Sequence, residues 1–168
     1  GALESFDRNV ISQYLNQSHS YSCISNTAGR TAAHLFCSCG RLDLANELMT
    51  HGADFLIPDG SGVTPLHELF SIVWDGDDRI YIIDFLNKLT THQPTITFNE
   101  RTQTGDTPLI LTVMHSRGTL VDYLLSRGGV NLDCQNKKGY SPLLLALELN
   151  MVNVANVLIE AGADLFLR

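Results

Sequence analysis

The sequence predicts an all-α repeat solenoid, a stack of helix-turn-helix units with β-hairpin or turn fingers along one edge. Similar segments recur behind four glycines, which are spaced by 33, 43 and 34 residues: Gly29, Gly62, Gly105 and Gly139. A second glycine follows 23 positions later in three of these units, at Gly52, Gly128 and Gly162. A shared internal interval is rare by chance, and a repeat of about 20–50 residues indicates a stacked array.

Each unit carries the signals for a short first helix. The opening glycine suits a tight turn, because glycine takes positive φ at little steric cost. A Thr or Ser then suits the N-cap, and a proline fits the first helical position without losing a hydrogen bond. These signals stand at Thr64-Pro65, Thr107-Pro108 and Ser141-Pro142, while Thr31-Ala32 keeps only the cap residue.

A second helix is predicted after each first helix. Its apolar residues recur at the i, i+4 spacing of one helical face. The pairs are Leu44 with Leu48-Met49, Leu120-Val121 with Leu124-Leu125, and Val154 with Val157-Leu158. The closing glycine then predicts a helix C-cap. Because an isolated helix needs about 12–15 residues, these short helices must stack to be stable.

The motifs "GVTPLH", "GDTPL", "GYSPL", "HGAD" and "AGAD" resemble the ankyrin-repeat family over residues 26–168. The resemblance implies antiparallel helix pairs, β-hairpin fingers, an L-shaped profile and a concave protein-binding face, without specifying a partner. The predicted units of this single domain are a partial or degenerate N-terminal unit (1–25), a repeat (26–58), a long repeat with an insertion (59–99), and two further repeats (100–135 and 136–168).

Composition excludes several classes of function. The net charge of −7, from 11 basic and 18 acidic residues, argues against a duplex nucleic-acid binder, which needs a basic face. No apolar run approaches the roughly 18 residues of a membrane span, so no direct membrane insertion is expected. The four cysteines lack zinc-site spacing and favour reduced thiols. With no secretory signal visible, we expect an intracellular protein, cytoplasmic or nuclear.

The positions that the units share, counted from each opening glycine, define a repeat frame. The second unit is longer than this frame, because 43 residues separate its opening glycine from the next one, against 33 and 34 elsewhere. We place the excess in "WDGDD" between its helices and in "THQPTIT", where the closing glycine is missing. An EF-hand loop starting at Asp75 would need Glu at its twelfth position, which is Leu86. A solvated acidic turn is therefore favoured, and Trp74 either covers the lengthened helices or anchors a partner.

The stretch "DGSGVTPLHELF" brings Ser61, His67 and Glu68 close in sequence, but a catalytic triad is recognised by geometry rather than proximity. The frame position of His67 is held in the other units by His34, Ile110 and Leu144. A residue shared by frame position indicates a structural part, able to hydrogen-bond the neighbouring loop. Cys37 shares its frame position with Phe70, Val113 and Leu147, which predicts a core residue. We therefore predict no catalytic residue, metal site or cofactor.

The resemblance implies that a partner contacts the fingers and the exposed side of each first helix. The predicted partner-binding residues are Arg30, Ser61, Val63, Ile72, Trp74, Met114, His115, Tyr140, Glu148 and Leu149. Ser71, Gln103, Thr104 and Asp106 map to the same face. Val63, Ile72, Met114, Tyr140 and Leu149 predict an apolar strip, which is typical of a contact surface; scattered surface hydrophobes are the alternative.

The sequence thus predicts a non-catalytic, monomeric module that presents a rigid concave face and finger tips to a protein or peptide partner. A structural or regulatory spacer packing within a larger enzyme or membrane protein is the alternative. A third hypothesis is a small-ligand site at Trp74 and its acidic neighbours. The last unit shows no polar cap, which predicts further repeats or another domain in a longer protein.

Overall fold

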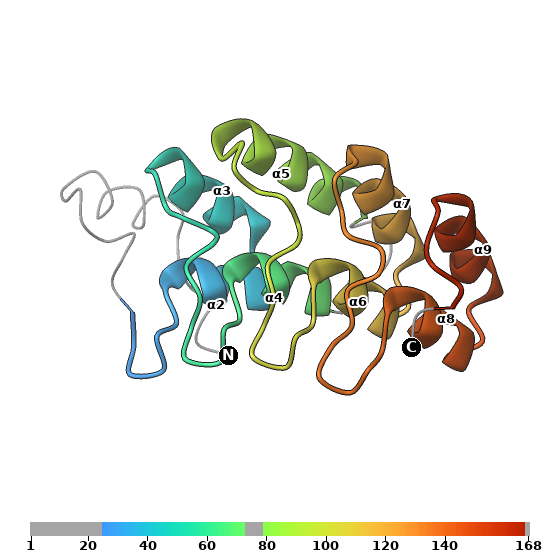
Figure 1. Cartoon of the computed structure of the whole chain (residues 1–168). Coiled ribbons are helices and arrows are strands. Elements are labelled where there is room, and N and C mark those ends of the chain that lie inside the picture. Colours follow the sequence, from blue (N-terminus) through green and yellow to red (C-terminus); the bar gives the residue numbers. More distant parts are fainter. Residues whose placement is uncertain (1–24, 73–78, 167–168) are drawn as a thin grey trace.

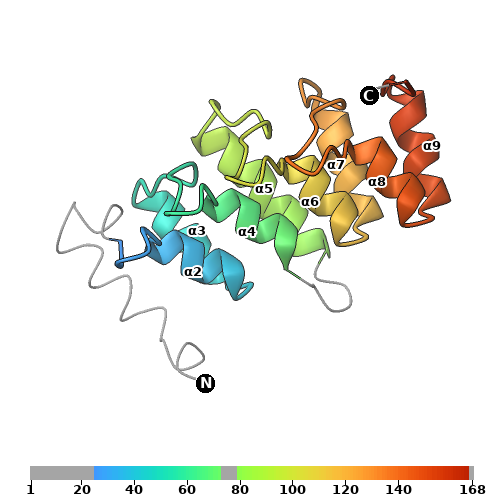
Figure 2. The same ribbon diagram turned by 60° about the horizontal axis from the view of Figure 1, so that its bottom comes forward.

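The computed structural model describes residues 25–72 and 79–166, and within them eight helices form two layers (Figure 1). The inner layer holds four seven-residue helices, α2 (Ala32–Ser38), α4 (Pro65–Ser71), α6 (Pro108–Met114) and α8 (Pro142–Glu148). The outer layer holds α3 (Leu42–Thr50), α5 (Arg79–His92), α7 (Gly118–Arg127) and α9 (Val152–Glu160). Consecutive inner helices pack side by side, which confirms the helical repeat solenoid (Figure 2).

The first helix of three pairs begins where the cap signals predict it. Thr64, Thr107 and Ser141 have extended backbones, and each hydroxyl accepts a hydrogen bond from the amide three residues later. For Thr64, the donor is the His67 amide at 3.3 Å. A proline follows each cap as the first helical residue, where its missing N–H leaves no bond unmade.

Three of the second helices, α3, α7 and α9, end at the predicted glycines. After α3, Gly52 takes φ +80°, and the Ala53 amide donates to the Leu48 carbonyl at 3.0 Å. After α9, Ala163 makes the same bond to the Leu158 carbonyl, also at 3.0 Å. A left-handed residue with this 6→1 bond is the Schellman helix end.

The core lies between the two layers. Buried leucines from both layers meet there, among them Leu44, Leu66, Leu89, Leu109 and Leu158. Cys37 is fully buried with them, and burial raises the pKa of its thiol. The predicted core position of Cys37 is confirmed, and its raised pKa keeps the thiol protonated and unreactive.

The long second pair accommodates its extra residues partly as helix. Helix α5 has 14 residues and runs through His92, so the start of "THQPTIT" is helical and only its remainder forms a loop. Gln93 follows α5 directly, and its Nε2 donates to the Ala53 carbonyl at 2.7 Å. The side-chain amide thereby fastens the end of this longer helix to the preceding pair. The predictions for residues 1–24, Trp74 and its acidic neighbours lie outside the described residues.

Aromatic rings pack between the second and third helix pairs. Phe98, in the loop after α5, packs edge-on against Phe70 of α4, with ring centroids 6.1 Å apart. The same ring also packs edge-on against Tyr123 of α7, with ring centroids 6.3 Å apart. Phe98 therefore joins the second and third pairs where the loop length departs from the frame.

Candidate functional site

Four turns, the fingers, precede α2, α4, α6 and α8 along one edge of the stack (Figure 1). Each closes with a backbone hydrogen bond, such as that from the Asp59 amide to the Val63 carbonyl at 2.8 Å. In three fingers a side-chain oxygen also accepts from two turn amides: Asn26, Asp59 and Asn136. Residues 25–72 and 79–166 contain no strand, only an isolated bridge between Ser25 and Thr31, so these fingers are turns.

Neighbouring fingers are tied together by backbone hydrogen bonds. The donor–acceptor pairs are Gly60 to Ala28 at 2.8 Å, Gln103 to Ser61 at 3.0 Å, and Lys137 to Thr104 at 2.8 Å. The Gln103 side chain adds a second link, because its Nε2 donates to the Gly60 carbonyl at 2.7 Å. The fingers are therefore held at fixed spacing. Together with the exposed sides of the inner helices they form one surface, which we call the finger face, and this surface is pre-organised.

The two frame histidines bind the fingers to the helices. His67 Nδ1 accepts from the Thr64 amide at 3.1 Å, which places the proton on Nε2, and Nε2 donates to the Glu100 carbonyl at 2.9 Å. His34 makes the equivalent bonds, to the Thr31 amide at 3.0 Å and the Val63 carbonyl at 2.9 Å. The predicted structural role of these histidines is confirmed.

Glu68 is the acidic residue that lies near Ser61 and His67 in the sequence. Its carboxylate forms an ion pair with Arg30 of the first finger. Both nitrogens of His67 and the carboxylate of Glu68 are therefore engaged in holding fingers to helices. This arrangement assigns the two residues to the scaffold.

Burial lowers the pKa of His67, although the Glu100 carbonyl and nearby carboxylates act in the opposite direction. The unfolded chain takes up a proton below its ordinary pKa of about 6.5, while the folded chain resists until the lower folded pKa is reached. Stability is therefore unaffected by this group above about pH 6.5 and is lost as pH falls below it. We therefore expect His67 to destabilise the folded chain as the pH falls from about 7.5 to about 5.5.

Urea unfolding at the two pH values measures this effect in the wild type and in His67→Gln, which cannot titrate. The variant should show the smaller difference between the two pH values. An equal pH dependence in both proteins would show that His67 does not titrate differently in the folded and unfolded chains.

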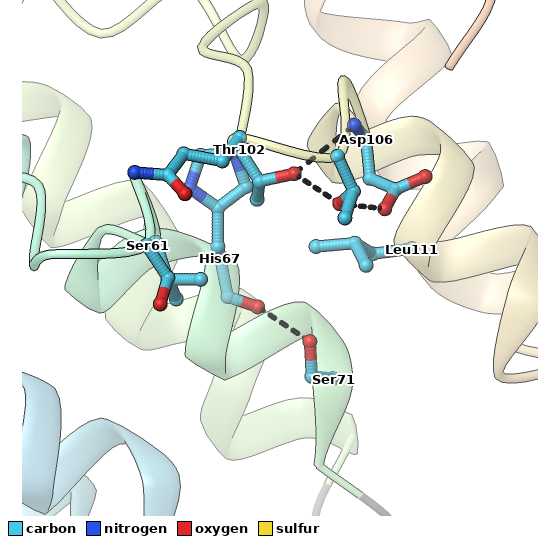
Figure 3. Close-up of a pocket in the computed structure, with 9 residues that line it drawn as sticks. Ser61, His67, Ser71, Thr102, Asp106 and Leu111 are labelled. Carbon is cyan, nitrogen blue, oxygen red and sulfur yellow. Dashed lines mark hydrogen bonds between the residues drawn. The ribbon is translucent and has the colours of Figure 1, made fainter. Parts of the chain in front are cut away.

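A pocket of about 310 Å³ opens on the finger face between the second and third fingers (Figure 3). Its lining comes from these fingers and from α4 and α6: Ser61, Val63, His67, Ser71, Thr102, Gln103, Thr104, Asp106 and Leu111. Ser61 lies on the side of the second finger, whereas Asp106 and Leu111 lie on the side of α6 (Figure 3). Two consecutive repeats therefore build this pocket together.

Three hydroxyls that line the pocket already donate a hydrogen bond to another group of the protein. Ser71 donates to the His67 carbonyl at 2.9 Å. Thr104 donates to Asp106 Oδ2, so the contact of 2.8 Å between the Thr102 and Thr104 hydroxyls is donated by Thr102. Since a hydroxyl carries one hydrogen, all three present only lone pairs to a ligand.

Charge and apolar contacts complete the environment of the pocket. Asp106 is buried behind the hydroxyls, where its Oδ1 accepts from the Asn136 side chain at 2.8 Å. Val63 of the second finger and Leu111 of α6 supply apolar surface. The pocket therefore suits a group that donates N–H bonds from the end of an apolar stem.

The predicted partner-binding residues occupy two ends of the finger face. Ser61 and Val63 line the pocket at the finger end. At the far ends of the inner helices stand Ile72, Met114, His115 and Leu149. A seven-residue helix is about 10 Å long, so Val63 at the finger end lies about that far from Ile72, Met114 and Leu149 at the other helix ends.

Tyr140 and Arg30 are held by neighbours. The Tyr140 hydroxyl bonds to the Glu148 carboxylate, which raises the pKa of the phenol. Because Glu148 is the last residue of α8 and Tyr140 precedes that helix, the ring lies along α8. Arg30 is half-buried against Glu68. Trp74 lies outside the described residues.

Sequence reasoning missed Thr102 and Leu111, which line the pocket. Leu111 lies in the first helix of its repeat, directly after Ile110, and nothing in that repeat indicates that it borders a pocket. Asp106 was expected on the surface and is only 8% exposed, because Asn136 of the next finger covers it. Both features depend on how successive repeats are placed, which the repeat frame alone does not specify.

Other chemistries find little support in the part of the chain that the structure describes. There, no three His, Cys, Asp or Glu side chains gather as a metal site would require. None of the helices in residues 25–72 and 79–166 has the length and apolarity to cross a membrane.

Comparison with protein families agrees with this architecture. The family model for the ankyrin repeat matches residues 28–60, and the model for three copies of ankyrin repeats matches residues 79–168. The chain belongs to the ankyrin-repeat family. Ankyrin repeats mediate protein–protein interactions and are generally non-catalytic, so the family supports an interaction module with a protein partner.

Several relatives are notch proteins. Neurogenic locus notch homolog protein 1 of Homo sapiens is 34% identical over 156 residues, covering 92% of this chain and 6% of that protein. The Mus musculus counterpart is 33% identical over the same length, with the same coverage of both proteins. Neurogenic locus notch homolog protein 2 of Homo sapiens is 28% identical over 162 residues, covering 96% of this chain and 6% of that protein. The chain therefore spans a small part of these relatives.

Proposed function

We propose that this ankyrin domain binds a segment of a partner protein on its finger face, with the pocket between the second and third fingers as the anchor. The observation that carries the proposal is the construction of this pocket from two fingers joined by backbone hydrogen bonds. A surface already fixed in its binding geometry loses little conformational entropy when a partner docks.

The chemistry of the pocket favours one kind of anchoring side chain. Hydroxyls that act only as acceptors, in front of the Asp106 carboxylate, complement a cationic N–H donor. Val63 and Leu111 suit the methylene stem that lysine and arginine carry. We propose that a lysine or arginine of the partner enters the pocket while the neighbouring residues run across the finger face.

The remaining predicted residues extend this surface. Tyr140 along α8 supplies an amphipathic ring, and Met114 and Leu149 supply exposed apolar side chains at the helix ends. Aromatic and methionine side chains are frequent in the centres of protein interfaces. We propose that these residues contact partner groups on either side of the anchor.

We further propose that the domain works as a monomer inside the cell, in the cytoplasm or nucleus. Cys37 supports this location, because its thiol forms no disulfide and is buried in the core. Reducing compartments maintain cysteines in this state.

Peptide display tests the binding proposal without knowledge of the natural partner. Peptides selected from a random library on the wild-type chain should be enriched in lysine or arginine at one position. Ser61→Arg introduces an arginine at the exposed edge of the pocket, which should weaken binding of these peptides by about 10-fold or more, a loss of about 1.4 kcal/mol.

Thr119→Arg is the matched control, since it makes the same charge change at an exposed position of α7 in the outer layer. It should leave the affinity within about 2-fold of wild type, less than about 0.5 kcal/mol. Equal weakening by the two variants, or none by Ser61→Arg, would refute the pocket as the anchor. Isothermal titration calorimetry measures both affinities.

A further inference from the structure

The fourth finger, which precedes α8, differs from the other three in charge. The two residues before its turn glycine are Lys137 and Lys138, and both are exposed. The same two positions are uncharged in the other fingers: Thr27-Ala28, Gly60-Ser61 and Gln103-Thr104. Arg101 adds a further positive charge near this tip, because its guanidinium donates to the Gln135 carbonyl at the base of the fourth finger. In a chain of net charge −7, this tip is therefore a local region of positive charge.

The backbone of the fourth finger matches that of the third, so their frame positions can be compared directly. Gly105 and Gly139 both have φ +82°, and the backbone hydrogen bond that closes each of these fingers is 3.0 Å long. Lys138 therefore leaves the backbone in the direction that Thr104 takes in the third finger. Because Thr104 lines the pocket, this direction places Lys138 on the finger face.

The fourth finger lies directly beside the finger that lines the pocket. The Lys137 amide donates to the Thr104 carbonyl at 2.8 Å. Packed helices lie about 8–10 Å apart, so the tip of the fourth finger stands about one such spacing beyond the third. An extended chain advances about 3.3 Å per residue, so a segment anchored in the pocket reaches this tip with about three residues.

The opposite side of the pocket offers no comparable charge. One repeat earlier, the positions of Val63 and Leu111 are held by Arg30 and Glu68. These two side chains form an ion pair, so the charge of Arg30 is neutralised within the protein. Among the described residues, none of the ion pairs involves either lysine of the fourth finger. A carboxylate of a bound segment is therefore favoured on the side of the fourth finger.

We propose that Lys137 and Lys138 bind a carboxylate of the same partner segment, an Asp or Glu about two to four residues from the anchoring lysine or arginine and on one side of it. The inference rests on the proposed function, since the pocket fixes where the segment lies. Two contacts of opposite charge give the segment one direction across the finger face, with its acidic residue toward α8. A reversed segment would place that residue near Glu68, and such like-charge contacts select against a wrong arrangement.

Peptide selection tests the charge pattern. Peptides selected on the wild-type chain should carry Asp or Glu at one position, about two to four residues from the basic anchor. The double variant Lys137→Glu, Lys138→Glu should select peptides that keep the anchor and lose the acidic preference. The net charge of −7 repels acidic peptides in general, so a preference at one position must arise locally. No acidic preference on the wild type, or the same preference on the double variant, would overturn the proposal.

Isothermal titration calorimetry of the tightest selected peptide measures the size of the effect. The double variant should bind it about 5-fold or more weakly, because two exposed attractions become repulsions. The matched control is Lys88→Glu, Arg127→Glu, which makes the same charge change at exposed positions of α5 and α7 in the outer layer. It should stay within about 2-fold of wild type.

A peptide whose acidic residue is replaced by lysine should bind the double variant more tightly than it binds the wild type. Absence of this reversal, or equal weakening by the two charge variants, would overturn the proposal. Circular dichroism of the double variant should match that of the wild type, because both lysines are exposed.

Ser61→Arg separates this proposal from the one on which it rests. If Ser61→Arg weakens binding while the double lysine variant does not, the pocket stands as the anchor and the acidic contact is refuted. If Ser61→Arg has no effect, the anchor itself is refuted, and the acidic contact with it.

Discussion

Replacement of Gly62 by alanine should lower the free energy of unfolding by about 3 kcal/mol. The positive φ of +70° at Gly62 costs an alanine about 1–2 kcal/mol. Its Cβ would also stand 2.9 Å from the Gln103 backbone nitrogen. The third finger must then move, which weakens the bond of 3.0 Å from the Gln103 amide to the Ser61 carbonyl and adds about 1 kcal/mol.

Gly139→Ala separates these two causes. Gly139 has φ +82° but nothing within 4 Å of an added Cβ, so only the cost of about 1–2 kcal/mol for the backbone conformation remains. Both substitutions restrict the unfolded chain equally, and that contribution cancels in the comparison. Urea denaturation of the two variants measures the difference, and equal losses would show that contact between fingers contributes nothing to stability.

Phe70→Ala should be still more damaging, with an expected loss of about 3–5 kcal/mol. Phe70 is fully buried in α4, and its ring meets that of Phe98 edge-on at a centroid distance of 6.1 Å. Truncation would open a cavity and remove the contact that fastens the loop after α5. The free energy of unfolding, obtained from urea denaturation, reports the loss.

Leu147→Ala tests the same frame position in α8, against which no further inner helix packs within residues 25–72 and 79–166. Because Leu147 is 56% exposed, we expect a change of no more than about 0.5 kcal/mol. A large loss for Leu147→Ala, or a small one for Phe70→Ala, would contradict the arrangement in which each inner helix buries the end face of the previous one.

Much of the fold could be predicted because each repeat carries its own local signals. Thr64 and Pro65 start a helix through bonds confined to one turn, and Gly52 ends one in the same way. The shared frame position of His34 and His67 also predicted their bonds to neighbouring loop backbone. Interactions within one turn, or repeated in several units, leave a pattern in a single sequence.

The remaining features arise where repeats meet or where the frame is interrupted. The contact between Arg30 and Glu68 spans 38 residues, and nothing near either residue indicates it. Phe98 takes φ +58° in a loop of unusual length, so no equivalent position predicted its contacts with Phe70 and Tyr123. The pocket needs side chains from two fingers and two helices, and its position follows only from their stacking.

The binding proposal is tested most directly by backbone amide chemical shifts during titration with the tightest selected peptide. The account predicts that the largest shifts fall at the pocket, on residues such as Ser61, Val63, Gln103 and Thr104, and that α7 and α9 remain unchanged. Shifts concentrated on the outer helices α3, α7 and α9, with the pocket amides unmoved, would contradict it.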